Sequence, residues 1–244
     1  MIYFDGDSHT YGEELERPQE QSFATVLARK LGHDFINLAV SGCSNDEIMR
    51  RVYRQLDHYR ATGTRPDLIV IGWTEVDRET WWVNGSGRSV DTYMLMGEEA
   101  KNMDPGRLDR FRTNVKYNGI YIAARTHYWY NQVYNLHCEL EHMKIPHLFF
   151  HGCRNWMLKW NDISSWNIVK MHDIHEYDWN RCFIRQRDPN FSLLQWAWEN
   201  GYPTTRYDHI DAYAHVQWAK LLYEYIETNQ LMSMYSSSTT SQPS

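Results

Sequence analysis

The N-terminal stretch Met1–Gly12, MIYFDGDSHTYG, decides the fold that we predict for this chain. Its apolar run Ile2–Phe4 has the length and the aromatic and β-branched content of a buried strand, and Gly6-Asp7-Ser8 ends that run at once. The Ser8 hydroxyl is therefore predicted at the carboxyl end of a strand. In open parallel α/β sheets that edge binds ligands, because loops rather than packed helices cover it. A serine there becomes a nucleophile only when a base removes its proton and donors hold the developing oxyanion.

Three further apolar runs have the character of buried strands, and helical patterns separate them. These runs are Phe35–Val40, Asp67–Trp73 and His147–His151. Apolar residues at helical spacing predict helices over Glu20–Leu31, from Ser44 through Tyr59, over Ser192–Asn200 and over Ala212–Ile226, with one long helix, or two broken near Gly119, between residues 108 and 140. Strands that alternate with helices imply right-handed crossovers and a parallel sheet, with the first strand near its middle.

The length of 244 residues suits one sizeable α/β domain, and no shift in composition marks a second one. We predict a single domain over residues 1–230, with insertions at about 79–104 and 155–190. The Ser/Thr-rich residues 231–244 are predicted to form a disordered tail. Four cysteines lie far apart without CxxC spacing, which suggests reduced thiols and neither a zinc site nor a disulfide framework.

Charge and hydropathy exclude several classes of partner. A formal net charge of -6 argues against a nucleic-acid backbone, because clustered Lys and Arg drive that binding. No apolar run is long enough to span a bilayer, and the first strand begins too early for a signal peptide to precede it. We therefore expect a cytoplasmic protein that needs no cofactor and acts on a small-molecule or carbohydrate ester.

Four short blocks of this sequence resemble those of the SGNH or GDSL hydrolases, a family of esterases and acyl hydrolases. Gly6-Asp7-Ser8 with Thr10 and Gly12 is similar to the first block, and Gly42 after the second predicted strand is similar to the second. Gly72-Trp73-Thr74-Glu75 stands where Gly-x-Asn-Asp belongs. Asp208-His209-Ile210-Asp211, with Ala219 ten residues after His209, resembles the block that supplies the catalytic histidine.

This resemblance implies a flavodoxin-like three-layer α/β/α sandwich with a central parallel sheet. It also implies that Ser8 is the nucleophile, that His209 is the base, and that the backbone N–H groups of Ser8 and Gly42 donate to the oxyanion. Thr74 replaces the family's third donor, an asparagine, and a hydroxyl reaches less far than a carboxamide. Arg206 stands where the family places its aspartate, so Asp208 or a backbone carbonyl is expected to orient His209.

The candidate site leaves three alternatives open. His215, further along the last helix, competes with His209 as the base, although its predicted position favours a structural role. His172 and His175 suggest a metal, but their spacing does not place both imidazoles on one helical face and no third ligand is evident. Several tryptophans in the insertions could stack on sugar faces, or could simply pack small satellite cores. These are Trp81, Trp82, Trp156, Trp160 and Trp166.

Two functions follow from these residues. The first is an acyl-ester hydrolase, with a small acyl group on a carbohydrate as the preferred substrate. The second is a non-catalytic binding or virion structural protein on the same fold, since compact chains without a signal peptide resemble bacteriophage-encoded members of the family. The Thr74 and Arg206 departures favour the second function. The fold alone does not decide between them.

Overall fold

The computed structural model describes residues 1–76, 78, 80–82, 89–90, 119–153, 155–156, 177–186, 188 and 190–235. Its centre is a sheet of four parallel strands in the order β2-β1-β3-β6. The strands are β1 (Ile2–Gly6), β2 (Phe35–Asn37), β3 (Leu68–Trp73) and β6 (His147–His151). Ile2 pairs with both Phe35 and Leu68, and Ile69 pairs with His147. The predicted parallel sheet, with the first strand inside it, is confirmed.

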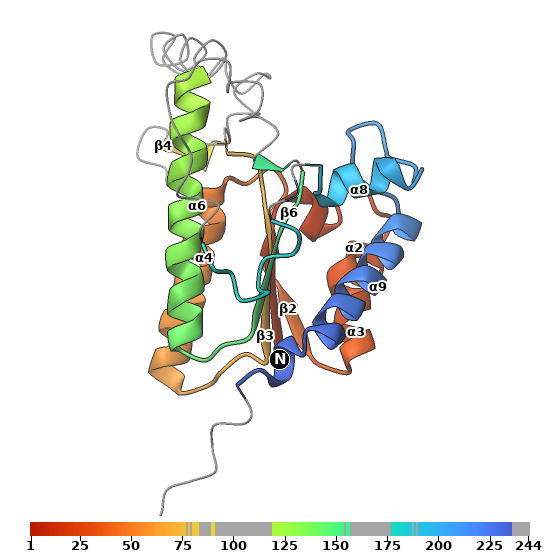
Figure 1. The fold of residues 1–244 in the computed structure, drawn as a ribbon. Helices are drawn as coiled ribbons and strands as arrows, with labels where there is room; N and C mark the ends of the chain where they lie inside the picture. The colour runs from red at the N-terminus through yellow and green to blue at the C-terminus, as the bar shows by residue number, and fades with distance from the viewer. Residues whose placement is uncertain are drawn as a thin grey trace, which may run out of the picture.

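Helices cover both faces of this sheet (Figure 1). One face carries α4 (Asn45–Thr62) and α6 (Gly119–His142), and the other carries α3 (Phe23–Leu31) and α9 (Ala212–Thr228). The shorter helices are α1 (Ser8–Tyr11), α2 (Pro18–Gln21), α8 (Leu193–Glu199) and the 3₁₀ turn η5 (Leu231–Ser233). This three-layer α/β/α sandwich has the flavodoxin-like strand order, so the predicted fold class is confirmed. No helix within the described ranges has both the length and the apolar composition needed to cross a bilayer.

Side-chain caps fix where the long helices begin. Ser22 accepts from the Thr25 N–H at the start of α3, and Asp211 accepts from the Ala214 N–H at the start of α9. At α4 the Ser44 hydroxyl accepts from the Glu47 N–H at 3.4 Å. The Glu47 carboxylate pairs with Arg50 in the same helix.

The two faces of the sheet bury separate apolar clusters. Alternate residues of each strand point to opposite faces, so Tyr3 packs toward α4 and α6 while Ile2 and Phe4 pack toward α3 and α9. All five residues of β1 and all six of β3 are buried, as expected for strands covered on both sides. The central strand therefore holds the loop that follows it in a fixed position.

Three predicted irregular segments contain regular structure. Within 79–104, the predicted loop, β4 (Trp81–Trp82) pairs antiparallel with β5 (Ser89–Val90). Within 155–190, Phe183 forms a parallel bridge with Phe149 at the open edge of β6, through Phe149 N–H to Cys182 O and Ile184 N–H to Phe149 O. The predicted tail at 231–244 begins too early, because η5 is ordered against the core and Leu231 is fully buried. Residues 236–244 lie outside the described residues.

Candidate active site

Ser8 is the first residue of α1, directly after the carboxyl end of β1. Gly6 has φ +156°, and a Cβ atom there would clash with the Thr10 side chain. Glycine is therefore required for the tight turn that carries the chain from strand to helix. The Ser8 residue is 4% exposed.

Asp7 holds this turn together from inside. Its carboxylate accepts from the His9 N–H at 3.0 Å and from the Cys153 thiol at 2.9 Å, and it forms an ion pair with Arg78. Burial raises the pKa of Asp7, but His9, Arg78 and the hydrogen bonds outweigh burial and hold that pKa below its usual range. Asp7 is fully buried, which suits a role in positioning Ser8 rather than in accepting a proton.

His209 lies in the loop before α9 and pairs with Glu14. Its Nδ1 is 2.7 Å from Glu14 Oε2. The Thr205 hydroxyl also donates to that oxygen, and hydrogen bonds from Thr205 and His209 hold the pKa of Glu14 below its usual range. The side chains of His209 and Glu14 are 14% and 25% exposed, so this pair faces solvent at the rim of the site.

The expected contact of His209 with Asp208 or a backbone carbonyl is not the one that the described residues show, because the His209 Nδ1 atom contacts Glu14. Asp208 has φ 60° in the tight turn between Thr205 and His209, and it is exposed. Glu14, which follows α1, has φ 63° and contacts His209 Nδ1 through its carboxylate.

His9 connects the Ser8 turn to His209. The His9 and His209 rings meet edge to face, with centroids 5.3 Å apart. Burial lowers the pKa of His9 to about 4, so this imidazole is neutral near pH 7. Its Nδ1 is buried and has no hydrogen-bond partner among the described residues. Among the residues that the structure describes, no hydrogen bond joins the Ser8 hydroxyl to His209. The predicted contact between these two side chains stays a prediction.

Thr74 and Gly42 lie at the same edge of the sheet as Ser8. Thr74 follows β3 and is fully buried, with its hydroxyl oxygen 4.0 Å from the Cys153 Sγ atom. The Cys153 and Thr74 side chains both help to hold the pKa of Asp7 below its usual range. Gly42 has φ 73° in the turn after β2, a left-handed conformation that favours glycine.

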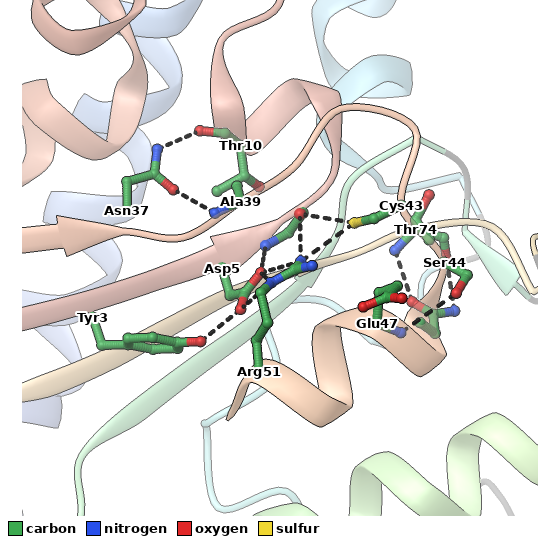
Figure 2. Close-up of polar contacts among 12 residues, drawn as sticks. Tyr3, Asp5, Thr10, Asn37, Ala39, Cys43, Ser44, Glu47, Arg51 and Thr74 are labelled. Carbon is green, nitrogen blue, oxygen red and sulfur yellow. Dashed lines mark hydrogen bonds and ion pairs between the residues drawn. The ribbon is translucent and has the colours of Figure 1, made fainter. Parts of the chain in front are cut away.

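Buried hydrogen bonds from α4 hold the ends of β1 and β3 in place, and Figure 2 shows those around Asp5 and Thr74. Asn45, at the start of α4, accepts from the Thr74 N–H at 3.0 Å and donates to the Thr74 carbonyl at 3.2 Å. The Asp5 carboxylate of β1 receives two-pronged hydrogen bonds from Arg51 of α4, as close as 2.6 Å. Because these bonds join two strand ends to one helix, they fix the spacing of the turns.

His215 and Trp156 have structural positions. His215 Nδ1 accepts from the Phe23 N–H at 3.1 Å, and its ring stacks on Phe23. Trp156 is buried and donates through Nε1 to the Thr74 carbonyl at 2.7 Å, so it cannot stack on a sugar. The side chains of Trp81 and Trp82, and residues Trp160, Trp166, His172 and His175, lie outside the described residues.

Sequence reasoning missed His9, Glu14, Arg78 and Cys153. His9 carried a weak signal as the neighbour of the predicted nucleophile. Cys153 lies 146 positions from Asp7 along the chain, and Glu14, although close to Ser8 in sequence, lies 195 positions from His209. No spacing rule connects either pair.

A sequence model described as a family of unknown function (DUF6071) matches residues 7–159 of this chain. The chain belongs to this family. The DUF6071 match includes Ser8, Glu14, Gly42 and Thr74, whereas His209 lies beyond its end. No curated protein matches the DUF6071 chain.

Solved structures resemble this DUF6071 protein weakly. The crystal structure of TesA aligns with a TM-score of 0.46 and 12% identity, over 93% of this chain and 98% of that one. A carbohydrate esterase with divergent catalytic and non-catalytic binding functions has a TM-score of 0.46 and 15% identity, over 95% of this chain and 65% of that one. The psychrotrophic esterase EstA from Pseudoalteromonas sp. has a TM-score of 0.45 and 13% identity, over 93% and 96%. The fold assignment therefore rests on strand order and layers.

Proposed function

We propose that this protein is a serine ester hydrolase with Ser8 as nucleophile, His209 as base and Glu14 as the acid that orients His209. The observation that carries this proposal is the 2.7 Å pair of His209 and Glu14, whose imidazole contacts the residue next to Ser8. A histidine between a carboxylate and a serine is the arrangement that activates a hydroxyl.

The proposed reaction has two steps. In the first, His209 Nε2 takes the Ser8 proton, the oxygen attacks the ester carbonyl, and the proton then passes to the leaving alcohol. In the second, water attacks the acyl-enzyme with His209 again as the base, which releases the acid. The Ser8 and Gly42 N–H groups are the proposed oxyanion donors. Because Thr74 is fully buried and its hydroxyl reaches less far than a carboxamide, we assign no third donor, and one fewer donor typically lowers turnover by about 10²- to 10³-fold.

A small acyl group on a carbohydrate is the substrate class that we propose. Support comes from the sequence, since β4 carries Trp81 and Trp82 a short distance after the end of β3. Flat rings with a polar N–H suit a sugar face. Acetylated oligosaccharides and simple aryl acetates are the substrates to compare.

A fluorophosphonate probe tests the nucleophile. We expect stoichiometric labelling of the folded protein and its loss in Ser8→Ala. Ser41→Ala, in the turn beside Gly42, is the matched control and should label fully. Labelling that survives Ser8→Ala would contradict the assignment.

A non-catalytic binding protein is the second candidate function. The specific observation that favours it is that Ser8 and His209 share no hydrogen bond in the described part of the chain, while Thr74 is fully buried. No labelling of folded protein, together with saturable binding of an acetylated oligosaccharide, would support this candidate over the enzyme.

A further inference from the structure

Two buried histidines face each other where α6 meets the start of β6. His137 Nδ1 lies 2.8 Å from His147 Nε2. The other nitrogen of each ring faces a backbone carbonyl: His147 Nδ1 is 2.9 Å from Ile145 O, and His137 Nε2 is 3.1 Å from Asp178 O. Both side chains are almost completely removed from solvent.

Two neutral imidazole rings have too few N–H groups to donate a hydrogen bond in all three of these contacts. A carbonyl oxygen only accepts, so each outward nitrogen must carry its N–H. A neutral imidazole has one N–H, and therefore the two nitrogens that face each other at 2.8 Å both present lone pairs. Two facing lone pairs repel, and a positive charge between them is needed to remove the repulsion. That charge is either a shared proton or a metal ion.

Two further donor groups favour the metal ion. Cys182 Sγ and the Glu141 carboxylate complete a set in which all four ligand atoms lie within 4.8 Å of one another. A shared proton would need only the two histidines, whereas a thiolate and a carboxylate bring the number of ligands to four. His, Cys and Glu side chains are the ligands of tetrahedral zinc sites. His137 and Glu141 are four residues apart, so they share one face of α6.

The surroundings have the pattern found around bound metals. Metal-bound histidines usually donate their second N–H to a carbonyl or a carboxylate, as the two outward nitrogens are arranged to do here. The Glu141 carboxylate is held by Tyr235 at 2.6 Å and by Asn180 at 3.3 Å. Zn–N bonds of about 2.0–2.1 Å and Zn–S bonds of about 2.3 Å place ligand atoms roughly 3.3–3.7 Å apart, so side-chain shifts on the order of 1 Å would close the set.

We propose that His137, Glu141, His147 and Cys182 form a structural zinc site. His147 begins β6, whereas Ser8 follows the end of the parallel strand β1. This site therefore lies at the amino ends of the strands, and Ser8 lies at their carboxyl ends. With four protein ligands it leaves no open position for a substrate. The ion joins α6 to β6 and to the segment that bridges the sheet edge at Phe183.

Zinc titration of the protein after chelator treatment tests this site. We expect one equivalent of Zn²⁺ to bind and the midpoint of thermal unfolding to rise, because an ion that binds only the folded state stabilises it. Cys182→Ser and His147→Gln should each weaken binding by at least about tenfold. Cys138→Ser and His142→Gln, at exposed neighbouring positions of α6, should bind as the unmodified protein does.

Cobalt gives a readout of the thiolate that does not depend on stability. With Co²⁺ in place of Zn²⁺ we expect a sulfur-to-cobalt charge-transfer band that is lost in Cys182→Ser and kept in Cys138→Ser. Equal zinc affinities of the unmodified protein and of Cys182→Ser would show that the proposal is wrong and that a shared proton occupies the site. If His147→Gln fails to fold, the zinc titration of the unmodified protein and the loss of the cobalt band in Cys182→Ser still test the proposed site.

Discussion

Ser8 stands between two ionisable residues with different tasks. Asp7 is fully buried and bonded to its own turn, to Cys153 and to Arg78, so its carboxylate holds the loop. His9 turns toward the last loop and contacts the His209 ring. Asp7 therefore holds the loop, Ser8 provides the hydroxyl, and His9 packs against the proposed base.

Replacing Glu14 by Gln should lower turnover of an aryl acetate. A carboxamide cannot stabilise an imidazolium, and it can favour the wrong tautomer of His209. We expect turnover to fall by at least about tenfold, and by as much as about 10⁴-fold if the tautomer reverses. Asp208→Asn is the control, because that side chain is exposed and not bonded to His209. A loss of activity in Asp208→Asn with full activity in Glu14→Gln would return the acid to Asp208.

His209→Ala and His215→Ala should have opposite effects. Loss of a general base costs about 10²- to 10⁴-fold in rate, whereas removing the partly exposed His209 ring should change the free energy of unfolding by less than about 1 kcal/mol. His215 is buried, stacks on Phe23 and accepts its N–H, so His215→Ala should cost about 2–4 kcal/mol in stability. Hydrolysis rates and urea unfolding measure the two effects. Full turnover in His209→Ala would show that the base is another residue.

The sequence identifies Ser8 and His209 as candidates but not Glu14. Motif spacing along the chain locates residues at strand ends and helix starts, which is enough for the first two. The Glu14 contact spans 195 positions and depends on left-handed backbone at Glu14 and Asp208, two non-glycine residues. No local pattern predicts such a conformation.

At the scale of elements, α4 is fixed to the central strand by a buried ion pair. The Arg51 side chain is 15% exposed and Asp5 is fully buried, and Tyr3 also donates to the Asp5 carboxylate at 2.5 Å. Arg60, nine residues later in the same helix, pairs with Asp57 and Glu139 at the surface, and its side chain is 45% exposed. The two arginines therefore allow a comparison within one helix.

Arg51→Met should destabilise the protein far more than Arg60→Met. Removing Arg51 leaves the Asp5 carboxylate buried without its cation, which typically costs about 3–5 kcal/mol. Removing Arg60 breaks exposed ion pairs, which are worth less than about 1 kcal/mol. Denaturant unfolding measures both changes. Equal losses would mean that α4 is held by its apolar face alone.

Most strands and helices can be predicted from the sequence, because their hydrophobic patterns differ. Helices repeat apolar residues every three or four positions, whereas buried strands are short apolar runs. The run before Ser8 and the runs at β3 and β6 are continuous and apolar, which is typical of strands buried on both faces. The bridge at Phe183 was missed because a single paired residue has no period. The start of the tail was misplaced because Ser and Thr follow so closely that they obscure Leu231, which is fully buried.

At the scale of the whole molecule, the sheet buries histidines on both of its faces. Burial lowers the pKa of His151 and His215 to about 3 and that of His9 to about 4. In the unfolded chain each would titrate near 6.5. Below that pH the unfolded state binds protons that the folded state does not, so acid should destabilise this fold before its carboxylates titrate.

The free energy of unfolding should therefore fall as the pH decreases from 6.0 to 5.0. Each of these histidines contributes about 1.4 kcal/mol per pH unit once the pH is well below 6.5, because its proton binds only to the unfolded chain. His151→Phe should reduce the slope by about 1 kcal/mol per pH unit, since phenylalanine suits the aromatic contacts with Trp156 and Phe183 and does not titrate. Urea unfolding at closely spaced pH values measures the slope, and an identical slope in His151→Phe would show that His151 is protonated in the folded protein.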